Sequence, residues 1–502
     1  MKGRLRKLKR LLSPNSDLAS QTVVGGMWVA FTNGGGRVLH LTMLVVLARL
    51  LSPSEFGVFG IALLALSALQ RFSQLGINDA LVQLPDADVD DYLDTAFTLR
   101  FIRGVVIAAV AYLLAPHVAS VFGEPRATAL LRAVVFATLF QTLNNPGTIY
   151  FEKDLEFHKQ FAFVISGTFT RVSVSIGYAL FVEATVWALA VGFLAGNFVQ
   201  MVASYLIHDY RPWPGFDVPK AREMVGYGKW ILGSGVVAFL FREGDDALVG
   251  VLLGSGALGL YQLSYRLSNA PATEIAQSVS RVVMPAYSKL QEDIEAVREG
   301  FFRALRLSTL VSFPVGVGII VVAPPFVATF LGDQWTEMIV PMQVLTGFGL
   351  LRSIRSPTSP LFKALGRPDY MTKIQAVRLA VLAVLIYPLT TAYDLTGTAA
   401  AVLVTGLVSA PLGAVLAARL VEDDVTSFAA ILAYPALGSA VMGAAAWTVR
   451  EGVAATGLGS LVTFVATVLT GVAVYAAVML ALERRFQFGL SELLAQVKGA
   501  AG

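Results

Sequence analysis

The chain has 502 residues, of which 56% are hydrophobic and only 14% are charged, and its formal net charge is +4. Soluble proteins carry about 25% charged residues, so this composition excludes an ordinary soluble domain and indicates an integral membrane protein. No cysteine is present, which excludes disulfides, thiolate metal sites and thiol nucleophiles. The four histidines are scattered without metal-ligand spacing, so we expect neither a metal site nor a cofactor.

The first twelve residues, MKGRLRKLKRLL, are basic and amphipathic. Such a segment is expected to stay on the cytoplasmic face and to contact anionic membrane lipid. The alternative, a cleaved signal peptide, fits poorly because the following apolar run is long, contains Arg37 and has no small-residue cleavage site. We therefore assign residues 1–21 to a basic cytoplasmic N-terminus.

Apolar runs of about 20 residues recur from one end of the chain to the other, and each is long enough to cross about 30 Å of hydrocarbon. They predict an all-α integral membrane protein with about fourteen transmembrane helices. The expected spans are residues 22–49, 56–77, 95–115, 127–145, 159–182, 185–207, 225–252, 257–283, 303–325, 337–360, 371–393, 396–418, 427–449 and 458–482.

Positive charge is concentrated in alternate loops between these spans. If the N-terminus is cytoplasmic, Lys and Arg gather in the inner loops and the C-terminal tail, whereas the outer loops hold little beyond Arg126 and Arg450. This distribution follows the positive-inside rule and predicts a multi-pass protein of the cytoplasmic membrane with both termini cytoplasmic. One inner loop, 84–94, is acidic instead, but acidic residues weigh little in orientation.

A short sequence recurs at an offset of 202 residues. LLSPSEFGVF, residues 50–59, returns as LLGSGALGLY, residues 252–261, and the same offset relates Trp28 to Trp230. Chance is the alternative in a chain this rich in Gly and Leu. We favour a duplicated half, as is common in transporters.

A duplicated half contains six spans, so both halves start on the same side of the membrane and are related by a pseudo-two-fold axis along the membrane normal. The predicted domains follow the spans. They are the N-terminus 1–21, a first six-helix lobe 22–207, a cytoplasmic connector 208–224, a second six-helix lobe 225–420, and two further helices with a cytoplasmic tail 421–502.

Three stretches carry a family resemblance. They are LARLLSPSEFGVFGIALLALSALQRFSQLGINDALVQ at 47–83, DDALVGVLLGSGALGLYQLSYRLSNAPATEIAQSVSRVVMPAYSKLQED at 245–293, and FKALGRPDY at 362–370. The chain resembles the polysaccharide-transporter (Wzx-type, colanic-acid-exporter-like) flippases of the multidrug/oligosaccharidyl-lipid/polysaccharide exporter superfamily. The resemblance implies two six-helix lobes around a central cavity, alternating access, and export of lipid-linked glycans.

Charged side chains inside the predicted spans are the candidate site. A charge at mid-bilayer costs at least about 2.5–3.5 kcal/mol on insertion scales, so it needs a partner or water. The arginines expected to line a central cavity and bind substrate are Arg37, Arg71, Arg171, Arg242 and Arg266. The carboxylates expected either to bind a coupling ion or to form structural ion pairs with these arginines are Asp245, Asp246 and Glu274.

Spacing suggests how these groups could meet. Arg71 lies 14 residues beyond Gly57, and Glu274 lies 15 beyond Gly259. The two side chains are therefore at nearly matched depth on equivalent helices, so a contact between the lobes is possible.

Two roles remain open for the arginines. Arginine is a bidentate ligand for phosphate, so a cationic cavity would suit a phosphate- or pyrophosphate-linked sugar. Alternatively, the charges neutralise each other and only hold helices together; Arg242 and Asp246 are four residues apart and share a helix face. Unpaired carboxylates in a low-dielectric wall could instead take up H⁺ or Na⁺.

The function favoured by these patterns is a flippase that moves a polyprenyl-linked oligosaccharide, on a phosphate or pyrophosphate carrier, across the cytoplasmic membrane by alternating access. The alternative is a drug or cation antiporter of the same fold, akin to the multidrug and toxic compound extrusion (MATE) proteins. A membrane enzyme is disfavoured because every outer loop is short and no phosphate-loop or H-E-x-x-H motif is present. We expect a monomer without a nucleic-acid partner.

Overall fold

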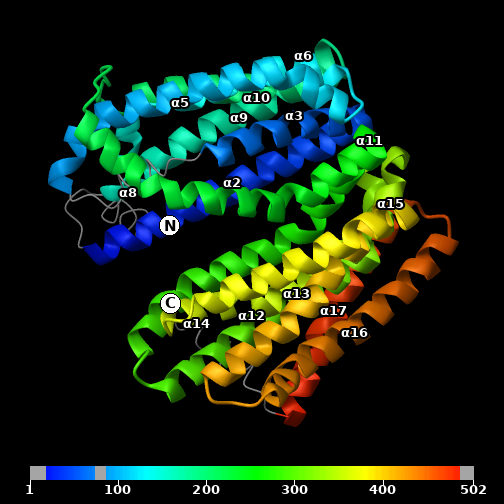
Figure 1. Ribbon diagram of the computed structural model, residues 1–502. Helices are drawn as coiled ribbons and strands as arrows, with labels where there is room; N and C mark the ends of the chain where they lie inside the picture. The colour runs from blue at the N-terminus through cyan, green and yellow to red at the C-terminus, as the bar shows by residue number, and fades with distance from the viewer. Residues whose placement is uncertain (1–17, 74–85, 487–502) are drawn as a thin grey trace, which may run out of the picture. The chain divides into compact units, whose positions relative to one another are not determined.

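The computed structural model describes residues 18–73 and 86–486, and every regular element in these ranges is a helix (Figure 1). The chain divides into two compact units, residues 1–259 and 260–502. Nine helices of the described ranges are long and apolar enough to cross a membrane. The predicted class, an all-α membrane protein, is therefore confirmed.

The first unit is a bundle in which α9 packs on both α2 and α10, and α3 packs on α5, α6 and α10. Figure 1 shows α3, α5, α9 and α10 running side by side. Its elements are α2 (Leu18–Leu50), α3 (Pro53–Phe72), α5 (Asp86–Val121), α6 (Arg126–Val134), α7 (Phe136–Thr142), η1 (Pro146–Ile149), α8 (Tyr150–Lys153), α9 (Phe157–Phe181), α10 (Val186–Ile207) and the beginning of α11 (Val218–Leu290).

Small residues bring α9 and α10 close together. A Cβ atom added to Gly192 would lie 1.9 Å from the Oγ of Ser175, and one added to Gly196 would lie 2.8 Å from the carbonyl oxygen of Gly167. Helices in lipid associate through such small residues because close backbone approach maximises van der Waals contact. A buried cluster that includes Leu47 continues this packing onto α2.

The second unit is built around α12, which packs on α13, α16 and α17. Its buried core includes the aromatic residues Tyr287, Phe301, Phe362 and Phe428. Its elements after the end of α11 are α12 (Ile294–Phe326), η2 (Val327–Leu331), η3 (Asp333–Met338), α13 (Ile339–Arg355), α14 (Thr358–Ala364), α15 (Asp369–Leu420), α16 (Val425–Ala455) and α17 (Ser460–Phe486).

Two long helices are interrupted by non-helical residues. In α11, Gly254 has φ 84° and ψ −178°. In α15, Tyr393 and Asp394 leave the helical region, and Asp394 has φ 51°. Each break falls within a few residues of a boundary between two predicted spans, so each helix contains two segments of span length.

Two helices begin earlier than the hydropathy pattern indicates. The predicted acidic loop 84–94 contributes its aspartates to the first turns of α5, which begins at Asp86. Similarly, α11 begins at Val218 inside the predicted connector, where Asp217 accepts a hydrogen bond from the Lys220 backbone N–H at 3.2 Å.

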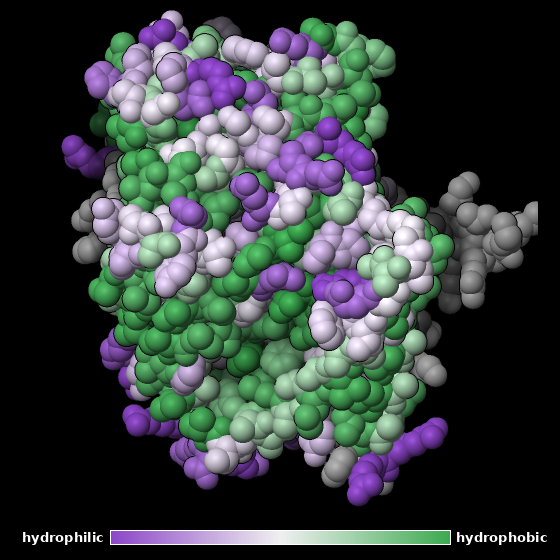
Figure 2. All heavy atoms as spheres, turned by 90° about the vertical axis from the view of Figure 1, so that its right-hand side faces the viewer, coloured by the Kyte–Doolittle hydropathy of each residue, from purple (hydrophilic) through white to green (hydrophobic). Residues whose placement is uncertain are grey.

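The surface is unusually apolar. Figure 2 shows hydrophobic residues over wide continuous areas of one face, and side chains such as Leu113, Phe181, Leu206 and Val384 are at least 70% exposed. Soluble monomers rarely expose large contiguous apolar areas. Contact with lipid explains this surface.

The recurring motif forms a backbone contact inside the first unit. A Cβ atom on Gly57 would lie 1.7 Å from the carbonyl oxygen of Ser255, and one on Gly259 would lie 2.0 Å from that of Pro53. Gly57 and Gly259 are 202 residues apart, as are Pro53 and Ser255. The two contacts are therefore reciprocal.

We predict that Gly57→Ala destabilises the protein, because the new methyl group would meet backbone atoms that cannot rotate away. Overpacking of this kind costs about 1–3 kcal/mol, so the melting temperature in nanodiscs should fall. Gly36→Ala is the matched control: Gly36 has open space around its Cβ position, and Ala favours a helix over Gly by about 1 kcal/mol. Equal melting temperatures for Gly57→Ala and the parent protein would contradict the close approach.

Candidate functional site

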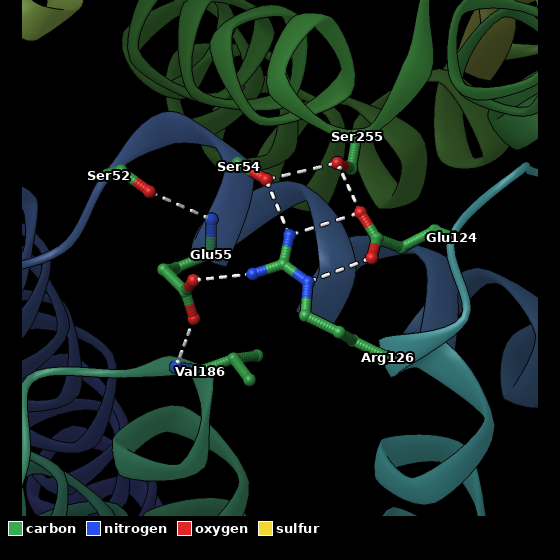
Figure 3. A network of polar contacts seen from close by, with 7 residues as sticks. All are labelled: Ser52, Ser54, Glu55, Glu124, Arg126, Val186 and Ser255. Carbon is green, nitrogen blue, oxygen red and sulfur yellow. Dashed lines mark hydrogen bonds and ion pairs between the residues drawn. The ribbon is translucent and has the colours of Figure 1, made fainter.

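A polar network joins four helix connections at one end of the first unit (Figure 3). We call it the turn network and define it as the side chains of Ser54, Glu55, Glu124, Arg126 and Ser255 together with the Val186 backbone N–H. These groups come from the start of α3, the α5–α6 connection, the start of α10 and the break in α11.

Arg126 is the centre of the turn network. Its Nη1 donates to Glu55 Oε1 at 2.8 Å and its Nη2 donates to Ser54 Oγ at 2.8 Å. Its Nε and Nη2 contact the two carboxylate oxygens of Glu124 at 2.8 and 3.1 Å. Such a bidentate pair fixes the orientation of both side chains. The hydrogen bond from Arg126 lowers the pKa of the Glu124 carboxyl, so this carboxylate stays ionised at neutral pH.

Ser255 links the segment after the α11 break to the other turns. Its hydroxyl donates to Glu124 Oε2 at 2.8 Å and lies 3.1 Å from Ser54 Oγ. On the opposite side, the second carboxylate oxygen of Glu55 accepts the Val186 N–H. Four connections that are far apart in sequence are thereby held by one guanidinium and two carboxylates (Figure 3).

Glu55 also has a local role. Ser52 is the N-cap of α3, and its hydroxyl accepts a hydrogen bond from the Glu55 N–H at 3.3 Å. Pro53 follows at the first helical position, where its missing N–H costs nothing. The sequence Ser-Pro-Ser-Glu thus starts a helix and places the Glu55 carboxylate at its first turn, facing Arg126.

The arginine predicted in the middle of α9 lies in a partly buried setting. The Arg171 guanidinium carbon is 4.6 Å from the centre of the Phe193 ring on α10. Its Nε is buried and has no hydrogen-bond acceptor among the described residues. A cation–π contact of this kind leaves the remaining N–H donors available to a ligand.

The other predicted residues of the first unit lie on three helices. Arg37 is exposed on α2, Arg71 is partly buried in the last turn of α3, and Arg242 is exposed on α11. Asp245 is only 6% exposed, and Asp246 beside it is partly buried.

In the second unit, Arg266 is exposed on α11. Glu274 lies in a stretch of α11 whose side chains are outside the described residues. The contact between Arg71 and Glu274 therefore remains a prediction.

Two arginines of α5 have partners that the sequence did not indicate. Arg103 donates to the Gln70 carbonyl at 2.6 Å and to Ser73 Oγ at 3.2 Å, and Arg100 donates to the Gln141 carbonyl at 3.2 Å. They satisfy carbonyl groups at the ends of α3 and α7, a common role for basic residues there. Only the fold brings these partners together.

The chain is similar to proteins of polysaccharide and glycan biosynthesis. The family model described as "Polysaccharide biosynthesis protein" matches residues 46–340. Lipopolysaccharide biosynthesis protein WzxC of Escherichia coli is 26% identical, over 72% of this chain and 73% of that protein. The probable low-salt glycan biosynthesis flippase Agl15 of Haloferax volcanii is 22% identical, over 77% of this chain and 80% of that protein.

Solved structures agree at the level of the fold. The lipid II flippase MurJ in an inward closed conformation gives a TM-score of 0.72 at 16% identity, over 92% of this chain and 99% of that one. An inward-facing multidrug resistance MATE family transporter of the MOP superfamily gives a TM-score of 0.62 at 15% identity, over 77% of this chain and 94% of that one. Because the family model matches more than half of its residues, the chain belongs to the polysaccharide biosynthesis protein family, and its helices are those of a multi-pass membrane protein.

Proposed function

We propose that this chain is a flippase that moves a lipid-linked oligosaccharide across the cytoplasmic membrane. The observation that carries the proposal is the family match over residues 46–340. It is supported by the similarity to relatives named for lipopolysaccharide and glycan biosynthesis. The sugar head group would cross in a hydrated cavity while the lipid tail stays in the bilayer. The alternative function, a MATE-type antiporter, is supported only by similarity of fold.

The helices fit fourteen membrane crossings. This count takes α11 and α15 as two crossings each, divided at Gly254 and at Tyr393–Asp394, and takes α6 to α8 and α13 with α14 as one crossing each. The first twelve crossings would form two lobes of six, with α16 and α17 added at the end. The positive-inside pattern supports cytoplasmic termini, and with that orientation the turn network would lie on the outer side.

With this orientation, the turn network closes the outer side. Arg126, Glu55, Glu124 and the Val186 N–H lie within the first six crossings and can stay together throughout a transport cycle. Only Ser255, beyond the break in α11, would have to leave when the outer side opens. A neutral hydrogen bond contributes about 0.5–1.5 kcal/mol and one to a charged group about 1.5–3 kcal/mol. The closure is therefore weak enough for substrate binding to reverse it.

The predicted arginines would bind the phosphate of the carrier. Arg171 supports this role because it forms no ion pair within the described residues and keeps free N–H donors beside Phe193. Arg37, Arg71, Arg242 and Arg266 would add positive charge to the same pathway. The carboxylate of Asp245, which is almost fully buried, would serve ion coupling or pairing.

We predict that loss of the gene causes undischarged lipid-linked glycan to accumulate on the inner leaflet. Complementation with the parent chain should restore export. Complementation with Arg37→Ala should restore it about ten- to a hundredfold less well, because a charged hydrogen bond to phosphate is lost. Arg37→Lys should recover only part of the difference, since lysine lacks the planar fork of donors. The measurement is the amount of exported glycan per folded protein.

Arg132→Ala is the matched control. The Arg132 side chain is already engaged with Tyr112, through a ring contact at 4.6 Å and a hydrogen bond to its carbonyl at 3.4 Å. Its removal should leave export near the parent level. Normal export by Arg37→Ala would remove Arg37 from the binding pathway. Altered drug tolerance with normal glycans in the deletion strain would favour the antiporter instead.

We predict that the stretch 208–217 is cytoplasmic. Cysteine labelling is specific because the chain has no cysteine of its own. A cysteine placed at Pro214 should react with a membrane-impermeant maleimide only after the cells are opened, whereas one placed at Gly123, in the α5–α6 connection, should react in intact cells. The reverse pattern would contradict the orientation and the outer placement of the turn network.

A further inference from the structure

The second unit contains a small, open pocket with a cavity volume of about 20 Å³, bounded by the end of α13, the start of α14 and two parts of α15. Its polar wall consists of Arg355, Thr358, Ser359 and Gln375. None of these residues belongs to the candidate cationic pathway. They were not singled out in the sequence because they lie on different helices.

In the part of the chain that the structure describes, the side-chain polar groups that line this pocket and have no partner are hydrogen-bond donors or hydroxyls. Within the described residues, the Arg355 guanidinium forms no hydrogen bond or ion pair, and the hydroxyls of Thr358 and Ser359 form no hydrogen bond. The Oε1 atom of Gln375 is occupied, because it accepts from Arg378 Nη1 at 3.1 Å. The amide NH₂ of Gln375 is therefore left for the pocket. Such a wall is complementary to an acceptor-rich ligand.

The local charge favours an anion. Arg352 lies one turn before Arg355 on α13 and repels it electrostatically. No carboxylate forms an ion pair with either arginine within the described residues. Two like charges at this spacing destabilise a helix, and partial burial of Arg355 strengthens the repulsion because it removes water. A bound anion would relieve both effects.

The remaining walls indicate what the anion is attached to. Phe362 and Ile374 form an apolar side, and Gly413 leaves room where another residue would project a side chain. The planar donor fork of arginine fits the oxygens of a phosphoryl group. We propose that this pocket binds a phosphoryl group, with Arg355 as its main ligand and Thr358, Ser359 and Gln375 as further donors. The phosphoryl group could belong to a lipid head group or to a soluble phosphate.

The test uses the purified full-length chain in nanodiscs and measures the melting temperature. In one arm the nanodiscs contain only phosphatidylcholine, and inorganic pyrophosphate is titrated. In the other arm pyrophosphate is absent, and the fraction of phosphatidylglycerol is raised. The parent chain should be stabilised in at least one arm. A response to pyrophosphate alone identifies a soluble ligand, and a response to phosphatidylglycerol alone identifies a lipid.

The variants separate the pocket from general charge effects. In the arm that stabilises the parent chain, the midpoint is the pyrophosphate concentration or phosphatidylglycerol fraction that gives half of the rise in melting temperature. Arg355→Gln should raise this midpoint at least about tenfold, as expected for the loss of a charged hydrogen bond, and Thr358→Val should raise it less. Arg419→Gln is the matched control, because Arg419 is an exposed arginine in the last turn of the same α15 that carries Gly413. Its midpoint should stay within about twofold of the parent value.

A second readout comes without any ligand. Since Arg355 is an unpaired, partly buried charge, Arg355→Met should melt at a higher temperature than the parent chain. The proposal is overturned if neither arm stabilises the parent chain, if Arg355→Gln responds as the parent does, or if Arg355→Met is less stable or unfolded. None of these results depends on glycan export, so they leave the proposed function to its own test.

Discussion

The structure of the first unit depends on a close backbone approach at Gly57 and Gly259. Any side chain at either position would overlap a carbonyl group of the opposing turn. Only with both glycines present can Ser255 come within 3.1 Å of Ser54 and 2.8 Å of Glu124. The turn network therefore depends on glycine, which has no side chain, at both positions. The reciprocal arrangement also gives the recurring sequence a structural meaning: the two copies of the motif contact each other within the first unit.

The membrane imposes the second constraint. In hydrocarbon, every backbone polar group must be bonded within the protein, so a chain this apolar folds into helices. Glycine and serine residues then allow neighbouring helix backbones to approach closely, as between α9 and α10. Two of the arginines have defined protein partners. Arg126 is held by two carboxylates at the end of the bundle, and Arg103 is held by the end of α3.

Much of the fold could be predicted from the sequence, because hydropathy over about 20 residues reports directly on membrane crossing. The helix class and the breaks near residues 254 and 394 follow from this signal. Helix starts were less predictable, since α5 and α11 begin in polar segments that hydropathy assigns to loops.

The sites were harder to predict than the helices. In the sequence, Arg126 is only an isolated charge in an outer loop, because its partner Glu55 is 71 residues away. Arg355 lay inside an expected span, but its pocket requires α14 and two parts of α15. Sequence spacing identifies groups that share a helix face, and it is silent about groups that meet only through tertiary packing.

In the proposed transport cycle, the outer side closes at the turn network and must open again each time substrate crosses. The most direct test is a reversible cross-link between cysteines replacing Ser54 and Ser255, whose hydroxyl oxygens lie 3.1 Å apart. A disulfide bond is about 2.05 Å long, so little movement is needed to form it. Oxidation should stop glycan export by the double variant and a reductant should restore it, whereas Ser54→Cys or Ser255→Cys alone should export under both conditions. Undiminished export by fully cross-linked protein would contradict this prediction.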